Sequence, residues 1–187
     1  MAWPPRFEAP VPADQGAPLD LVLGLGSNLG DRVARLDFAV ARLSEIATIV
    51  AASSLYETAP VGPPQPHFLN AAVRLAWPRA AHELLSATLE IERLAGRERR
   101  ERWGPRTLDL DLLWIRGRCV DAEALTIPHP RLHERPFALL PLLEVAPDAA
   151  DPRTGALYVT IAAALDRSGV RQLATNEFRW LARPPAP

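Results

Sequence analysis

The order of apolar periodicities between residues 20 and 115 is the feature of this sequence that most restricts its fold. Short apolar or alternating runs predict strands, and apolar residues that recur every three or four positions predict helices. The predicted elements are a strand at 20–26, a helix at 31–47, strands at 48–57 and 68–77, a helix at 80–95 and a strand at 107–115. This order predicts an α+β ferredoxin-like sandwich with a βαββαβ core, an antiparallel sheet, helices packed on one face and the other face open to a ligand.

Chain length and proline content set the predicted domain boundaries. A chain of 187 residues allows one domain with a substantial core and is short for two. Of its 20 prolines, five lie in residues 1–18 and three in residues 184–187. Two short amphipathic segments, 137–145 and 157–165, are expected to close the core. The predicted organisation is a proline-rich N-terminal tail at 1–18, a single catalytic domain at 19–167 and a C-terminal extension at 168–187.

The charged residues and the cysteine count exclude several classes of protein. The net charge is -1, and all 21 residues in the Lys+Arg count are arginine. Without lysine, Schiff-base and pyridoxal chemistry, a Walker-type phosphate loop and a protein kinase are excluded, so any phosphate is bound by arginine. The lone Cys119 excludes an internal disulfide and a multi-cysteine zinc site, and no apolar run is long enough for a membrane span or a signal peptide. We therefore expect a cytoplasmic protein whose function is not the binding of duplex nucleic acid.

Two aspartates in the predicted strand at 107–115 form the strongest chemical signal. Asp109 and Asp111 are two residues apart, so both point to one side of the strand. The residues predicted to point into the core are Leu108, Leu110, Leu112 and Trp114. The two carboxylates repel each other, and aspartate is a poor strand former. A pair of this kind alone is more often a solvated sheet face, but it is also how Mg²⁺ is held at phosphoryl-transfer sites.

Arginines just before the aspartate pair favour the metal interpretation. Six of the 21 arginines fall between residues 93 and 106. A run of charge is usually a solvated surface, yet the planar guanidinium suits bidentate contact with phosphate. Trp103 lies in the same segment, either as a hydrophobic plug or as an aromatic group that covers a base or another heterocycle. The segment is therefore a candidate polyphosphate-binding loop.

Three weaker signals lie elsewhere. The segment GLGSNLGD at 24–31 does not match the dinucleotide fingerprint, so we interpret its glycines as a tight strand-to-helix turn. His129 stands between two prolines in a loop at 125–135, where a surface histidine and a histidine aimed at a ligand are equally compatible with the sequence. Phe68 and Asn70 share the open face of their predicted strand, either as structural residues or as a platform for a flat, hydrogen-bonding ligand.

Four segments together resemble one enzyme family. They are LGLGSNLGDR, YETAPVGPPQPHFLNAAV, GRERRERWGPRTLDLDLL and LTIPHPRLHERPFALLPLLEVAP, in the order of the 6-hydroxymethyl-7,8-dihydropterin pyrophosphokinases of folate biosynthesis. The resemblance extends over residues 21–167. It implies a ferredoxin-like fold and transfer of the β,γ-diphosphate of ATP to the hydroxymethyl group of the dihydropterin, with release of AMP.

The same resemblance implies roles for individual residues. Asp109 and Asp111 match the ligands of two Mg²⁺ ions, and Arg97 and Arg106 match catalytic arginines. The matched pterin-binding positions are Thr58, Ala59, Pro60, Val61, Phe68, Asn70, Trp103 and Phe137. The matched nucleotide-binding positions are Glu92, Arg99, Trp103, Arg106, Leu112, Thr126, His129 and Arg135. The arginine-rich loop is one residue shorter than in some relatives, which leaves open whether Arg99 or Arg100 contacts the nucleotide.

Two alternatives remain at the level of sequence. A Mg-dependent kinase of another flat heterocyclic alcohol would release ADP rather than AMP. A non-enzymatic module for single-stranded nucleic acid would use Trp103 and the arginines without the aspartates. The resemblance instead implies a monomer whose partners are the small molecules ATP and hydroxymethyldihydropterin, with no nucleic acid and no membrane.

Overall fold

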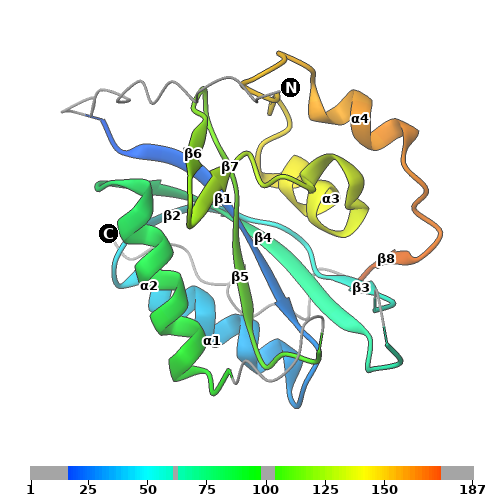
Figure 1. Cartoon of the computed structure of the whole chain (residues 1–187). Coiled ribbons are helices and arrows are strands. Elements are labelled where there is room, and N and C mark those ends of the chain that lie inside the picture. The colour runs from blue at the N-terminus through cyan, green and yellow to red at the C-terminus, as the bar shows by residue number, and fades with distance from the viewer. Residues whose placement is uncertain (1–16, 61–62, 98–103, 174–187) are drawn as a thin grey trace, which may run out of the picture.

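A six-stranded antiparallel sheet forms the centre of the computed structural model, which describes residues 17–60, 63–97 and 104–173 (Figure 1). The strands are β1 Leu19–Ser27, β2 Thr48–Ala52, β3 Tyr56–Thr58, β4 Phe68–Trp77, β5 Asp109–Ile115 and β8 Val170–Gln172. Their order is β5-β1-β4-β3-β8, and β2 pairs with β4 beside β3. Because β1 pairs with both β4 and β5, it brings residues from three strands together.

One face of the sheet is covered by two helices, α1 Arg32–Ser44 and α2 Ala81–Leu94 (Figure 1). The Asp31 side chain caps α1 by accepting a hydrogen bond from Ala34 N at 3.0 Å, which satisfies a backbone donor at the helix start. The apolar face of α1 packs against alternate residues of β4, from Leu69 to the fully buried Trp77. The predicted alternation of the strand at 68–77 is therefore confirmed.

The predicted ferredoxin-like βαββαβ core is confirmed by this arrangement. The predicted strand at 48–57 is divided into β2 and β3, because the chain between them leaves the regular ladder with β4. Ser53 replaces part of that ladder: its N–H donates to Ala72 O at 2.9 Å, and its hydroxyl oxygen accepts from Ala72 N at 2.8 Å.

The second face of the sheet is only partly open. Helices α3 Pro136–Val145 and α4 Tyr158–Ala164 form a second apolar cluster with residues of β1, β4 and β5. Leu139, Leu142 and Tyr158 are among its most buried members. The expectation of an open face therefore holds only for the end of the sheet that α3 leaves uncovered.

A β-bulge in β5 changes the direction of Trp114. The register between β1 and β5 shifts so that Leu113 has no partner of its own between Leu112 and Trp114. An extra residue of this kind reverses the side-chain alternation beyond it. Leu112 therefore packs under α1 and α2, whereas Trp114 packs with α3 and α4 on the other face. The prediction that Trp114 points the same way as the leucines is wrong.

Gly24 and Gly26 are strand residues, in agreement with the predicted strand at 20–26, so the interpretation of the glycines of 24–31 as a tight turn holds only for Gly30, whose φ is 67°. Both lie inside β1, which continues to Ser27. A Cβ on Gly26 would lie 3.3 Å from Asn70 Oδ1, and a Cβ on Gly24 would lie 3.1 Å from the Leu113 side chain. Glycine is favoured here because side chains from the neighbouring strands cross over β1.

The remaining elements complete the second face and the edge of the sheet. They are the hairpin β6 Val120–Ala122 and β7 Leu125–Ile127, and the short 3₁₀ helix η1 Leu132–Glu134. The predicted loop at 125–135 therefore begins with a strand. β8 belongs to the segment predicted as a C-terminal extension, yet it pairs with β3. Within the described ranges, every helix is too short or too polar to cross a membrane.

Candidate active site

A cavity of about 600 Å³ opens over the uncovered end of the sheet. Strands β1, β4 and β5 form its floor, and the start of α3 and the turn before β8 contribute to its walls. The predicted site residues that line it are Thr58, Ala59, Pro60, Phe68, Asn70, Arg106, Asp109, Asp111, His129, Arg135 and Phe137. Segments that are far apart in the sequence thus meet in one cavity.

The other predicted site residues lie elsewhere. Leu112 is in the core, Thr126 is on β7, and neither contributes to the cavity lining. Arg97 and Glu92 lie behind the lining and contact Asp109 and the β5 backbone. Val61, Arg99 and Trp103 fall outside the described residues.

Gly26 joins the two halves of the cavity floor. It pairs with Asn70 of β4 on one side and with Asp109 of β5 on the other. Directly paired residues share one face of a sheet, and adjacent strands are about 4.8 Å apart. The amide and the carboxylate therefore stand on one row, with backbones about 10 Å apart and only a hydrogen atom on Gly26 between them.

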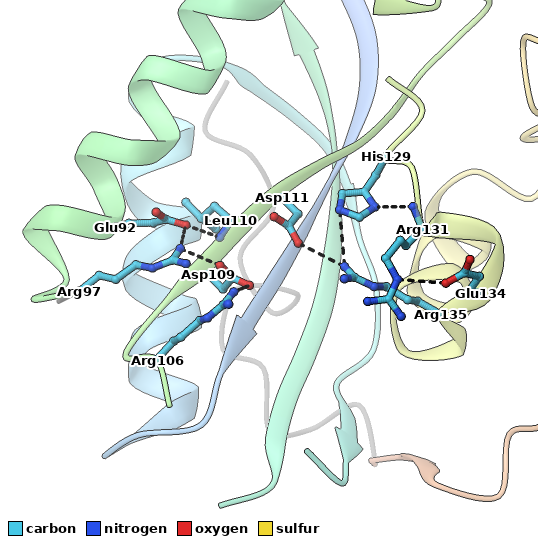
Figure 2. Close-up of polar contacts among 10 residues, drawn as sticks. All are labelled: Glu92, Arg97, Arg106, Asp109, Leu110, Asp111, His129, Arg131, Glu134 and Arg135. Carbon is cyan, nitrogen blue, oxygen red and sulfur yellow. Dashed lines mark hydrogen bonds and ion pairs between the residues drawn. The ribbon is translucent and has the colours of Figure 1, made fainter. Parts of the chain in front are cut away.

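Asp109 is held by two arginines (Figure 2). Arg97 Nη1 lies 2.6 Å from one carboxylate oxygen, and Arg106 Nη1 lies 2.7 Å from the other. Glu92, which is almost fully buried, accepts hydrogen bonds from Leu110 N at 2.8 Å and from Arg97. Arg97 is thereby fixed between two carboxylates, while the Arg106 guanidinium reaches the cavity.

Asp111 has a different environment from Asp109. Within the described part of the chain its nearest cation is Arg135, with Nη1 at 4.0 Å from Oδ2. Burial, and secondarily the charge of Asp109, raise the pKa of Asp111 to about 6. The side chain is still 42% accessible, through the cavity. Among the described residues its charged form is therefore poorly compensated, and its oxygens face the cavity, where they can contact another cation.

The aspartate pair fits a magnesium ion that completes its coordination with other oxygens. Carboxylate oxygens are the donors that Mg²⁺ prefers, and it is usually held by one or two of them together with water and phosphate. Across the described residues, no group of three or more His, Cys, Asp and Glu side chains is arranged as a metal site. The donor set suits a metal that arrives with a polyphosphate better than one held by protein alone.

His129 presents a hydrogen-bond donor to the cavity. Burial and the nearby Arg135 and Arg131 lower the pKa of His129 to about 4, so the ring is neutral at pH 7. Its Nδ1 accepts a hydrogen bond from Arg131 N at 3.1 Å, which leaves the proton on Nε2. Arg135 Nη1 lies 3.5 Å from this Nε2. Two donors side by side form a site for an anion.

The opposite end of the cavity is aromatic and largely uncharged. Phe68 from β4 and Phe137 from α3 contribute to its lining. The Asn70 side chain donates from Nδ2 to Thr58 Oγ1 at 2.8 Å, which fixes the direction of the amide. Asn70 Oδ1 remains over Gly26 as an acceptor. This end suits a flat ligand with N–H groups on its edge.

Asn28 is a positioning residue that sequence reasoning missed. It is 2% exposed and directly follows β1. Its Oδ1 accepts from Arg106 N at 2.7 Å, and its Nδ2 donates to Gln65 Oε1 at 2.9 Å and Pro66 O at 3.1 Å. The only sequence signal was an amide after a strand, because these partners lie 37 to 78 residues away.

The chain is similar to one family of known proteins over most of its length. Residues 22–147 match the family model of 7,8-dihydro-6-hydroxymethylpterin-pyrophosphokinase. The chain is 44% identical over 151 residues to the 2-amino-4-hydroxy-6-hydroxymethyldihydropteridine pyrophosphokinase of a Synechocystis strain, covering 80% of this chain and 77% of that protein. It is 43% identical over 152 residues to the Bacillus subtilis protein of the same name, covering 80% and 87%.

Solved structures resemble the chain at lower identity. A crystal structure of an HPPK-DHPS protein in complex with substrates has a TM-score of 0.70 at 12% identity, covering 84% of this chain and 47% of that one. The Plasmodium falciparum HPPK-DHPS A437G variant has a TM-score of 0.64 at 13% identity, covering 81% and 46%. The chain thus spans about half the length of these solved chains, and the likeness shows the fold.

Proposed function

Because the chain belongs to the 7,8-dihydro-6-hydroxymethylpterin-pyrophosphokinase family, we propose that its cavity is the place where a pyrophosphoryl group passes from ATP to the dihydropterin. The activity is that of the family: ATP-dependent pyrophosphoryl transfer to hydroxymethyldihydropterin in folate biosynthesis. The row of Asn70, Gly26 and Asp109 supports this location of the reaction. It connects the aromatic end of the cavity, where the Asn70 amide lies, to the end lined by carboxylates and arginines.

The dihydropterin occupies the aromatic end in this proposal. Phe68 and Phe137 contact the faces of the ring, and Asn70 Oδ1 accepts from an N–H on its edge. Thr58 supports the amide through its 2.8 Å hydrogen bond. Ala59 and Pro60 line the cavity next to Thr58. Val61 and Trp103 are proposed as further pterin contacts from the family resemblance alone. Fixing the ring in this way aims its hydroxymethyl group along the row toward Asp109.

The triphosphate of ATP occupies the charged end of the cavity, which is lined by aspartates and arginines. Arg106, His129 Nε2 and Arg135 are donors for phosphate oxygens, and Arg97 supports Asp109 from behind. Asp109 and Asp111 would hold Mg²⁺, two ions in this proposal, and the bound metal would supply positive charge that neutralises phosphate oxygens. The family resemblance proposes Arg99 and Trp103 as further nucleotide contacts. It also proposes Glu92, Leu112 and Thr126, which lie outside the cavity lining.

Alignment and charge stabilisation drive the reaction, and no covalent intermediate is needed. The hydroxyl oxygen of the pterin attacks the β-phosphorus and gives up its proton to solvent, the bond from that phosphorus to the oxygen shared with the α-phosphate breaks, and AMP leaves with that oxygen. Arg106 and His129 donate to oxygens whose negative charge increases as this bond breaks. We further propose that the chain acts in the cytoplasm as a monomer.

The identity of the nucleotide product tests this function. Incubation of the protein with ATP, Mg²⁺ and 6-hydroxymethyl-7,8-dihydropterin, followed by phosphorus NMR, is expected to show AMP and a pterin diphosphate in equal amounts. Formation of ADP would instead indicate a simple kinase. Absence of turnover together with salt-sensitive oligonucleotide binding would favour the nucleic-acid alternative.

Gly26→Ala is expected to raise the KM for the dihydropterin by roughly tenfold, because a 1 Å misplacement of a substrate has effects of that size or larger. The added methyl carbon would lie 3.3 Å from Asn70 Oδ1 and 3.8 Å from Asp109 Cβ, so the amide must move. Steady-state kinetics with each substrate varied in turn measures the effect.

Gly24→Ala is the matched control for this substitution. Its methyl group would meet the flexible side chain of Leu113 at 3.1 Å and not the Asn70 amide. A larger pterin KM in Gly24→Ala than in Gly26→Ala would show that crowding of β1, and not displacement of the amide, accounts for the result.

A further inference from the structure

The segment that ends in β8 forms a wall of the cavity, although it follows the residues matched by the family model. That match ends at residue 147, whereas Asp166, Gly169 and Val170 line the cavity. Val170 pairs directly with Thr58 of β3, so the two side chains share a face at the pterin end. In Figure 1 β8 lies beside β3 at the edge of the sheet, near α3.

The backbone alone holds β8 weakly. The strand has three residues and, within the described part of the chain, pairs with β3 alone. So short a ladder has little stability of its own. Leu173 N donates to Leu55 O at 2.8 Å beyond its end. The ion pair of Arg171 with Glu57, at 2.6 Å, involves an arginine side chain that is 71% exposed, and exposed pairs of this kind contribute little.

One carboxylate on α3 connects the parts that surround β8. Glu144 accepts hydrogen bonds from Tyr56 Oη on β3 at 2.5 Å, from Ser54 N at 2.6 Å and from Gln172 Nε2 on β8 at 2.7 Å. Hydrogen bonds to an ionised carboxylate are stronger than bonds between neutral groups. Glu144 therefore fixes a helix, a strand and the edge strand relative to one another.

The same helix carries an aromatic wall of the cavity. Phe137 lies in the first turn of α3, and Glu144 lies in the last turn, about 10 Å further along the helix axis. A helix transmits a shift at one end to the other. The contacts of Glu144 thus hold the helix that carries Phe137 against the strands that carry Thr58 and Val170.

We propose that Glu144 is a positioning residue for the dihydropterin, which holds β8 as a wall of the pterin end and sets the width of that end. The proposal rests on the proposed function for the location of the pterin. It assigns to Glu144 no contact with either substrate. Its loss should therefore affect pterin binding and leave the nucleotide end, built on β5 and the 129–135 segment, unchanged.

Glu144→Ala tests the proposal by steady-state kinetics in the full chain. The KM for the dihydropterin at saturating Mg-ATP is expected to rise roughly tenfold or more, since the pocket walls are no longer aligned. The KM for ATP and kcat should stay within about twofold of wild type, because chemistry in the filled site is unaffected. A merely structural role would lower the active fraction, and so kcat, without a selective change in the pterin KM.

Two further variants make the test decisive. Asp148→Asn is the matched control, because Asp148 also joins the segment after α3 to the sheet, through Arg116 at 2.8 and 3.1 Å, but away from the cavity. It should leave both KM values unchanged. Gln172→Ala removes only the exposed contact of β8 with Glu144 and should raise the pterin KM in the same direction by a smaller factor.

The outcomes separate this proposal from the proposed function. If wild type releases AMP and Glu144→Ala retains the wild-type pterin KM, the positioning role is wrong while the enzymatic function stands. If Glu144→Ala does not fold, Gln172→Ala becomes the test of the positioning role of Glu144. An unchanged pterin KM in Gln172→Ala would then overturn that role. If wild type forms no AMP, the proposed function itself fails.

Discussion

Asp111→Asn is expected to lower turnover by about three orders of magnitude or more, a loss of about 4 kcal/mol of transition-state stabilisation. The proposed metal loses the carboxylate whose oxygens face the cavity, and an amide is a weaker ligand for Mg²⁺. Asp109→Asn should have an effect of similar size, with the additional loss of the partner of Arg97 and Arg106. Single-turnover kinetics at saturating Mg²⁺ measures both.

The same substitution should stabilise the metal-free protein at neutral pH. The pKa of Asp111 is about 6 in the folded chain, against an ordinary value of 3.8. The folded state therefore keeps a proton that the unfolded chain releases, and stability is lost as pH rises through about 6. Asn carries no charge, so thermal unfolding of Asp111→Asn should occur a few degrees higher at pH 7 and depend less on pH between 4 and 7.

Asp121→Asn is the control for the turnover measurement. Asp121 accepts hydrogen bonds from Arg153 at 2.6 and 2.8 Å on the surface and has no place in the cavity. It should leave turnover unchanged. Near-normal turnover of Asp111→Asn would disprove the metal assignment, whatever its thermal stability.

Arg106→Ala is expected to slow the chemical step by about a hundredfold to a thousandfold, the range seen when one preorganised donor to a developing charge is removed. Its guanidinium lines the cavity beside Asp109, and its backbone is fixed by Asn28 through bonds of 2.7 and 3.1 Å. Affinity for the pterin should change little, because the proposed partners of Arg106 are phosphate oxygens. Single-turnover rates and equilibrium pterin binding, measured separately, distinguish these effects.

Replacement by lysine gives a graded comparison. Arg106→Lys should recover part of the lost rate, since an ammonium keeps the charge but lacks the planar fork of donors. Full recovery would show that charge alone matters at this position. If Arg106→Ala had a normal rate of chemistry but bound the pterin weakly, Arg106 would act at the pterin end of the cavity and not at the phosphate end.

The fold was predictable because its periodicities are local. Alternation in the strand at 68–77 and helical spacing at 80–95 both correspond to the elements found. The features of the fold that local patterns did not predict depend on contacts between segments that are far apart in the sequence. The bulge at Leu113, which reverses Trp114, is visible only against β1. The short β8 became a strand through pairing with β3, more than 100 residues earlier.

The residues of the candidate active site were predictable to about the same degree as the fold. The pattern of Asp109 and Asp111 indicated a shared face from strand geometry alone, and both line one cavity with Arg106. No sequence pattern indicated that Asp109 would be paired with two arginines while the oxygens of Asp111 face the cavity. The turn interpretation was wrong for Gly26 because a glycine under a crossing side chain and a glycine in a turn look alike in sequence.

In the proposed site, the row of Asn70, Gly26 and Asp109 fixes the distance between the two bound substrates. The two ends of the cavity are separated by two strand spacings, which backbone hydrogen bonds set and which vary little from sheet to sheet. Loops at the rim can therefore change in length and composition, and with them the affinity for each substrate. The distance over which the transferred group must travel stays constant through such changes.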